Sequence, residues 1–231
     1  MKDSRTSDAV VARLEDAIAS GALPDAQMLP AERELMEQFG TSRTVIREAI
    51  STLANRGLLE TRPRHRPVVR RAGFDSVLKS AGPVVQQLLQ SPLGVKNLYD
   101  TRLFVEKGLV RNAALNADRT GIRALKEALS ENEAAIDTAQ RFYETDIAFH
   151  AVFYTIAANP VLTAINQGFV SWLAPQWSKM ERSPKRNLVN FKAHQAIYLA
   201  ILERDPDLAE QALESHLAEA WKYVESTFDD N

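Results

Sequence analysis

The stretch LPAERELMEQFGTSRTVIREAISTLANRGLLE, residues 29–60, decides the fold of the first third of the chain. It predicts two short helices, at 31–39 and 43–55, joined by a tight turn at Gly40. The second helix carries Arg43 and Arg47, which are four residues apart and therefore lie on one face. A short helix with exposed arginines, braced by a partner helix, has the dimensions to enter the major groove of DNA.

The sequence on either side completes this DNA-binding shape. Upstream, Ser7 is placed to cap a helix that runs to residue 19, and Gly21 follows its end. Downstream, residues 58–61 and 67–70 are typical of two short strands. Three helices followed by a β-hairpin predict a winged helix-turn-helix.

The N-terminal end of the 43–55 helix is the part expected to reach base edges. Thr41 or Ser42 is predicted to cap it, and Ser42, Arg43 and Thr44 are placed to contact bases and phosphates. Arginine suits the bidentate contact with guanine O6 and N7. Two alternatives stay open here: Arg47 could instead pair with Glu34 or Glu48, and Arg56 could serve the C-terminal dipole of the helix.

The hairpin, or wing, reads TRPRHRPVV over residues 61–69 and contains no glycine. A turn that needs φ > 0 would therefore be strained. Four arginines in and beside it, among them Arg64, favour contact with phosphate or with the minor groove. Residues 41–71 hold eight arginines and two glutamates, a local charge of +6 in a chain whose net charge is −2. The basic surface thus coincides with the predicted DNA-reading elements.

From about residue 73 the pattern changes to long amphipathic helices. Several starts are marked by a capping residue followed by proline, as at Ser91-Pro92 and Asn159-Pro160. The expected fold class is mainly α, with two domains: a winged helix-turn-helix at 1–72 and an all-α bundle at 73–231. The bundle is predicted to hold about seven helices, at 74–90, 95–116, 120–136, 139–157, 161–181, 185–203 and 207–227.

Composition excludes several classes of protein. The 231 residues are 45% hydrophobic, enough for a substantial core, and contain no cysteine, so disulfides and thiolate metal sites are excluded. No apolar run of about 18 residues is present, and the first residues have no apolar core typical of a secretory signal. The cytoplasm is the expected compartment, with no membrane partner.

Three histidines and one aspartate lie on apolar helical stripes of the second domain, where polar groups are costly unless they satisfy each other or bind something. Asp146 and His150 are one i,i+4 step apart; His194 and His216 lie among apolar neighbours on two later helices. A single histidine of this kind is more often a satisfied core residue. The set of four favours a divalent metal, Zn²⁺ or Ni²⁺ by ligand type, and less strongly Mn²⁺ or Fe²⁺.

Arg102 continues an apolar stripe and is therefore also expected to face inward. A metal held by three neutral histidines and one aspartate keeps a charge of +1, which a carboxylate could complete. Arg102 and Glu106 are accordingly the candidate effector-binding pair. The alternative is a buried Arg102–Glu106 ion pair that only holds the bundle together, and both hold if Glu106 orients Arg102 toward the ligand.

These motifs resemble the GntR family of bacterial transcription regulators. PAEREL at 30–35, SRTVIREAI at 42–50 and L-x-x-R-G-L-L at 53–59 match its N-terminal signature. R-x-x-x-E at 102–106, D-x-x-F-H at 146–150, His194 and the segment from Asp205 to Leu217 resemble the FCD ligand-binding domain of the FadR subfamily. The resemblance covers nearly the whole chain. It implies that Arg33, Arg43 and Arg47 contact DNA and that Asp146, His150, His194 and His216 are metal ligands.

Two segments, ANPVLTAINQGFVSWL and ERDPDLAEQALESHL, are most similar to the sialic-acid-responsive repressors of this subfamily. The expected function is therefore a metal-containing transcription regulator, a repressor, controlled by sialic acid, another sugar acid or another small organic acid. Because one winged helix reads only a few base pairs, a homodimer on a short inverted repeat is expected. The competing classes are a metal-dependent enzyme and a regulator with a purely structural metal.

Overall fold

A computed structural model describes residues 2–70, 73–180 and 183–229. The chain divides into two compact units, Met1–Ala81 and Gly82–Asn231. Helix α4, Phe74–Leu88, contains this division and carries Pro83 in its interior. The domain boundary expected between residues 72 and 73 falls beside residues 71–72, which lie outside the described residues, so that boundary stays a prediction.

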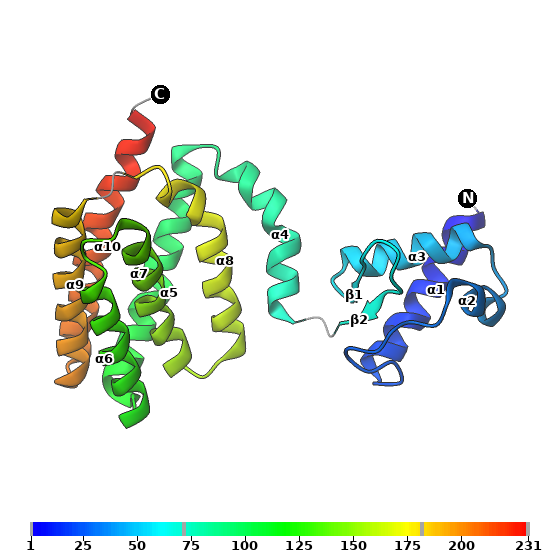
Figure 1. The fold of residues 1–231 in the computed structure, drawn as a ribbon, viewed down its shortest axis with the longest axis horizontal. Helices are drawn as coiled ribbons and strands as arrows, with labels where there is room; N and C mark the ends of the chain where they lie inside the picture. Colours follow the sequence, from blue (N-terminus) through cyan, green and yellow to red (C-terminus); the bar gives the residue numbers. More distant parts are fainter. Residues whose placement is uncertain (1, 71–72, 181–182, 230–231) are drawn as a thin grey trace. The chain divides into compact units, whose positions relative to one another are not determined.

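The first unit is a winged helix-turn-helix (Figure 1). Its elements are α1 Lys2–Ala19, α2 Glu32–Phe39, α3 Arg43–Asn55, β1 Leu59–Glu60 and β2 Val68–Val69. Helix α2 ends at Gly40, whose φ of 61° supplies the left-handed cap predicted for the turn. Ser42 then caps α3 by accepting from the Val45 N–H. The apolar faces of the three helices and both strands meet in one core that includes Leu29, Leu35, Ile46, Ala49, Leu53 and Val69.

One sequence expectation in this unit is wrong. Ser7 does not cap α1, because the helix begins at Lys2 and Ser7 lies inside it with only 3% of its surface exposed. Capping residues are common inside helices wherever a small side chain suits the packing, so the local signal was ambiguous.

The glycine-free wing closes with an arginine in a left-handed conformation. Strands β1 and β2 pair antiparallel, with Leu59 opposite Val69. In the turn between them the His65 N–H donates to the Arg62 carbonyl at 3.1 Å, and Arg64 has φ = 64°. Pro63 followed by a residue with positive φ is the arrangement of a type II turn, whose third position normally holds glycine. The wing therefore forms at the expense of strain at Arg64.

The second unit is a bundle of long helices, built from the remainder of α4 and six further helices (Figure 1). These are α5 Pro92–Asn116, α6 Arg119–Ala134, α7 Ala139–Ile156, α8 Pro160–Trp177, α9 Pro184–Leu202 and α10 Pro206–Asp229. Proline at the first helical position follows a capping side chain at Ser91, Asn159 and Ser183. With α4, the described residues contain the seven helices predicted after residue 73, and the fold class is confirmed.

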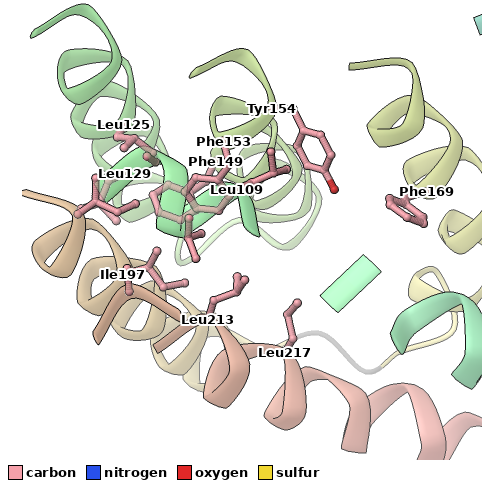
Figure 2. Packing of buried hydrophobic residues seen from close by; sticks show 14 of the residues in the cluster. Leu109, Leu125, Leu129, Phe149, Phe153, Tyr154, Phe169, Ile197, Leu213 and Leu217 are labelled. Carbon is pink, nitrogen blue, oxygen red and sulfur yellow. The ribbon is translucent and has the colours of Figure 1, made fainter. Parts of the chain in front are cut away.

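The core of this unit lies between α5, α6, α7, α9 and α10. Figure 2 shows Phe149 and Phe153 of α7 between the leucines of α5 and α6 and the apolar side chains of α9 and α10. Phe149 also stacks on the ring of His194, with 4.4 Å between the centroids. The same packing that excludes water therefore holds the imidazoles in place. Within the described residues, none of the helices is long and apolar enough to cross a membrane.

Candidate metal centre and DNA-reading surface

Three of the predicted metal ligands converge on one point in the second unit. His216 Nε2 lies 3.2 Å from His150 Nε2 and 3.2 Å from His194 Nε2. Their candidate ligand atoms all lie within 4.8 Å of one another, and all three side chains are buried. The histidines come from α7, α9 and α10, so the site exists only because three helices bring their apolar faces together.

Asp146 joins this group from the turn of α7 that precedes His150. Its Oδ1 lies 3.5 Å from His194 Nε2, and a quarter of its side chain is exposed. The i,i+4 spacing places Asp146 and His150 on the same helix face, as the sequence predicts. All four predicted ligands are therefore neighbours, with three nitrogens and one carboxylate as the donor set.

Buried partners fix which nitrogen of each imidazole carries the proton. His150 Nδ1 lies 2.7 Å from Glu106 Oε2, and His194 Nδ1 lies 2.9 Å from Asn132 Oδ1. The Asn132 amide nitrogen donates to Thr145 Oγ1 at 3.0 Å, which orients its oxygen toward His194. Both histidines therefore donate through Nδ1 and present an Nε2 lone pair to the centre of the group.

Burial sets the charge state of these groups. It lowers the pKa of His194 and of His216 well below the ordinary value, so both are neutral at pH 7. Burial raises the pKa of Asp146. It also acts to raise the pKa of Glu106, but the charges of Arg102 and His150 outweigh it and hold that pKa at about 2. Glu106 is thus an ionised carboxylate in the interior.

The group suits a divalent cation. Lone pairs of His150 and His194 point at a third imidazole nitrogen 3.2 Å away, and a single proton on His216 cannot satisfy both. A cation among the nitrogens removes this conflict. Three imidazoles and one carboxylate are borderline ligands of the kind that zinc and nickel prefer.

A cavity of about 70 Å³ opens beside the metal ligands. Asp146, His150 and His216 line it, so a metal at this site would face the cavity. Its volume is enough for about five water molecules. The remaining lining combines aromatic rings with polar side chains: Tyr99, Arg102, Phe142, Tyr143, Trp177, Arg186, Asn187 and Asn190.

The structure separates the two residues of the predicted effector pair. Arg102 lines the cavity, with its guanidinium carbon 5.1 Å from the centre of the Trp177 ring. Glu106 is not part of the lining and has no exposed surface. It accepts from Arg102 Nε at 2.7 Å and from the Tyr154 hydroxyl at 3.2 Å. Both alternatives for the pair thus hold together: it is a buried ion pair, and it aims Arg102 at the cavity.

The predicted DNA-reading side chains of the first unit are exposed. Arg43 and Arg47 of α3 are 61% and 65% exposed, and both lie beside one carboxylate, Glu32 of α2, at 3.6 Å and 2.9 Å. This is neither of the partners considered for Arg47. Arg33 is 81% exposed and lies 4.0 Å from Glu37, and Thr44 is exposed beside the Ser42 cap.

The remaining arginines of this unit divide into structural and exposed groups. Arg66 donates to the Leu29 carbonyl and Arg70 to Glu60, so both brace the wing. Arg56 pairs with Glu15 of α1 at 2.5 Å, which favours a structural role. Arg64 is exposed at the tip of the turn.

Sequence reasoning missed three residues of these sites. Asn132 and Arg186 are polar residues on helix faces, and nothing local distinguishes them from surface side chains. Glu32 follows Pro30 at a helix start, where an acidic residue is expected for capping and dipole reasons alone. A count of polar residues on the inward stripe of α6 could have found Asn132.

Comparison with known proteins agrees with this division. The model of the "Bacterial regulatory proteins, gntR family" matches residues 6–69, and that of the "FCD domain" matches residues 97–219. The HTH-type transcriptional repressor NanR of Klebsiella aerogenes is 35% identical over 216 residues, which is 92% of this chain and 83% of the relative.

Solved structures share the fold. Streptococcus agalactiae GntR has a TM-score of 0.62 at 23% identity, covering 93% of this chain and 98% of that chain. An FCD domain described as metal-free covers 59% of this chain and 95% of its own, with a TM-score of 0.50 and 16% identity.

Proposed function

The chain belongs to the gntR family of bacterial regulatory proteins and carries an FCD domain, and on this premise we propose that it is a repressor controlled by a small carboxylate bound beside a divalent metal. It is a DNA-binding transcription regulator and not an enzyme, since that is what this family comprises. The proposal adds the repressor role, the metal, the effector and the residues that bind them.

The metal is held by Asp146, His150, His194 and His216, and zinc is the first candidate, with nickel second. The observation that carries the proposal is the convergence of the three Nε2 atoms beside a cavity that also contains Arg102. A metal that was only a structural staple would not need an open side. When bound, the metal supplies a cationic contact for an anionic ligand.

The effector carboxylate then lies between the metal and Arg102. Arginine offers two parallel donors to a carboxylate, and the buried setting strengthens this contact. The aromatic rings and amides of the cavity suit the rest of a small polar acid. The resemblance to sialic-acid-responsive repressors favours sialic acid or another sugar acid, with citrate-like acids as alternatives.

The output is a change in DNA binding. Arg33, Ser42, Arg43, Thr44, Arg47 and Arg64 contact an inverted repeat, and a homodimer supplies two such surfaces in the cytoplasm. The effector acts only if it binds the DNA-releasing arrangement more tightly than the DNA-bound one. Release from DNA is the expected direction.

A thermal-shift screen tests the effector class. The full chain, stripped with chelator and reloaded with Zn²⁺, is compared with the stripped protein in N-acetylneuraminate, in citrate and in the neutral sugar N-acetylmannosamine. We expect a carboxylate to raise the melting temperature only in the zinc form, and to release an operator isolated by selection from random DNA. A shift from the neutral sugar, or a carboxylate shift that survives chelation, would contradict the proposal.

An Asp146→Asn variant separates the effector role from a structural staple. If the metal contributes only stability, this variant should melt at a lower temperature while its carboxylate shift stays unchanged. If the proposal holds, loss of the metal removes the shift as well.

A further inference from the structure

Glu106 is a buried carboxylate that contacts both halves of the proposed site. Its Oε1 accepts from Arg102, which lines the cavity, and its Oε2 accepts from Nδ1 of His150, a proposed metal ligand. Both contacts are 2.7 Å, and Glu106 itself has no exposed surface. It can therefore act on an effector only through its partners.

The contact with His150 determines whether that residue can bind a metal. A carboxylate accepts hydrogen bonds but cannot donate, so its presence at Nδ1 places the proton there and leaves Nε2 as a lone pair. An imidazole with a proton on Nε2 could not be a ligand through that atom. Carboxylate partners of this kind also raise the basicity of the histidine ligand.

The contact with Arg102 determines where the cavity cation lies. Arg102 is 7% exposed, and its Nε donates to Glu106. Because Nε is engaged by Glu106, the Nη edge of the guanidinium is the part left to meet a carboxylate in the cavity. One oxygen of Glu106 thus sets the cation, and the other sets the metal ligand.

The geometry points to Glu106 as a positioning residue that couples the effector cavity to the metal: Arg102, Glu106 and His150 form a relay through which a change at either end alters the other. This inference rests on the metal site of the proposed function but needs no effector. Glu106 shares one negative charge between a guanidinium and an imidazole. Loss of the guanidinium leaves that charge to His150 alone, which strengthens its bond to a cation.

Asn132 provides an internal comparison. It orients His194 as Glu106 orients His150, through Nδ1 at 2.9 Å, and it is also buried. It is a neutral amide, however, and its nitrogen donates to Thr145, which does not line the cavity. A variant at Asn132 should therefore weaken metal binding without touching the relay.

The first test measures zinc affinity of the full chain against a chromophoric chelator. Glu106→Gln replaces one acceptor oxygen with an NH₂ group, so the substituted side chain cannot accept from both Arg102 and His150 at once. We expect zinc affinity to fall by about 10–100-fold, as for other partners of metal-binding histidines. Tyr154→Phe, which removes only the 3.2 Å contact to Oε1, is the matched control and should change affinity much less. Equal zinc affinity in Glu106→Gln and the unsubstituted chain would overturn the inference.

The second test is a double-mutant cycle without effector. Arg102→Met removes the guanidinium, and we expect it to raise zinc affinity at least about threefold more in the chain with Glu106 than in the Glu106→Gln background. The direct field of Arg102 on the metal acts in both backgrounds and therefore cancels. With Asn132→Ser in place of Glu106→Gln, the Arg102→Met effect should persist in full. An equal Arg102→Met effect in the Glu106 and Glu106→Gln backgrounds would refute the relay.

The third readout is the imidazole tautomer, which a general loss of stability would not change. Proton–nitrogen correlation spectra of the metal-free chain should assign His150 to the Nδ1–H form. Glu106→Gln should move it toward the Nε2–H form, while Tyr154→Phe should not. Because these measurements use zinc alone or no ligand, failure of every carboxylate in the effector screen would leave their outcome unaffected.

Discussion

The left-handed residue at the tip of the wing gives the sharpest prediction. Arg64 has φ = 64° in the turn between β1 and β2. A side chain with a Cβ in this region costs about 1–2 kcal/mol, whereas glycine loses about 0.5–1 kcal/mol more backbone entropy on folding than alanine. Arg64→Gly should therefore make the first unit about 0.5–1 kcal/mol more stable than Arg64→Ala does, which isolates the backbone from the lost charge.

The assay has to report on the first unit alone. All three tryptophans lie beyond residue 170, so their fluorescence reports on the second unit. Native-state hydrogen exchange of the α3 amides is the suitable measurement, and about two- to fivefold greater protection in Arg64→Gly is expected. Equal or lower protection in the glycine variant would mean that the wing does not use this turn.

The same pair of variants tests the role of Arg64 on DNA. Both lack the charge, so both should lower the slope of log affinity against log salt by about 0.9, the value for one phosphate contact. Arg64→Lys keeps the charge and should keep the slope. An unchanged slope in the glycine and alanine variants would remove Arg64 from the DNA-binding surface.

Three further predictions concern the remaining sites. Burial lowers the pKa of His194 and His216, so their contribution to stability is complete above about pH 6.5 and is lost as the pH falls; urea denaturation of metal-free protein should show a lower unfolding free energy at about pH 5 than at about pH 7, and a smaller drop in His216→Asn. Chelation should lower the melting temperature of the second unit and added Zn²⁺ should restore it, an effect that Asp146→Asn should weaken in a calorimetric titration. Glu32→Gln removes the carboxylate beside Arg43 and Arg47 and should raise affinity for random-sequence DNA more than for a selected operator, whereas Glu37→Gln should affect both alike; fluorescence anisotropy at fixed salt distinguishes these outcomes.

Most helix boundaries could be predicted because the signals that set them are local. Capping side chains followed by proline begin α5, α8 and α9, and Gly40 with φ = 61° ends α2. The four proposed ligands could also be found, since a polar side chain on an apolar stripe faces the core whatever the tertiary arrangement. Ser7 shows the limit of this reasoning, because a capping residue is also a good small residue for the inside of a helix.

The partners of the ligands could not be predicted. His194 meets Asn132 across 62 positions of sequence, and His150 meets Glu106 across 44. Periodicity says which face of a helix is buried but not which residue of another helix lies opposite. The separation of Arg102 from Glu106, one lining the cavity and the other behind it, likewise depends on the packing of α5 against α7 and α10.

The spread of the proposed ligands along the chain has a consequence for how the protein matures. Asp146 and His150 leave the ribosome first, His194 follows, and His216 on α10 comes last of the four. The closing loop between His150 and His216 spans 66 residues, so its ends meet only after α10 has packed against α5 and α9. Tight capture of metal is then a late step of synthesis, and a truncated chain that lacks α10 would hold metal weakly. Metal loading would thereby distinguish complete molecules from unfinished ones.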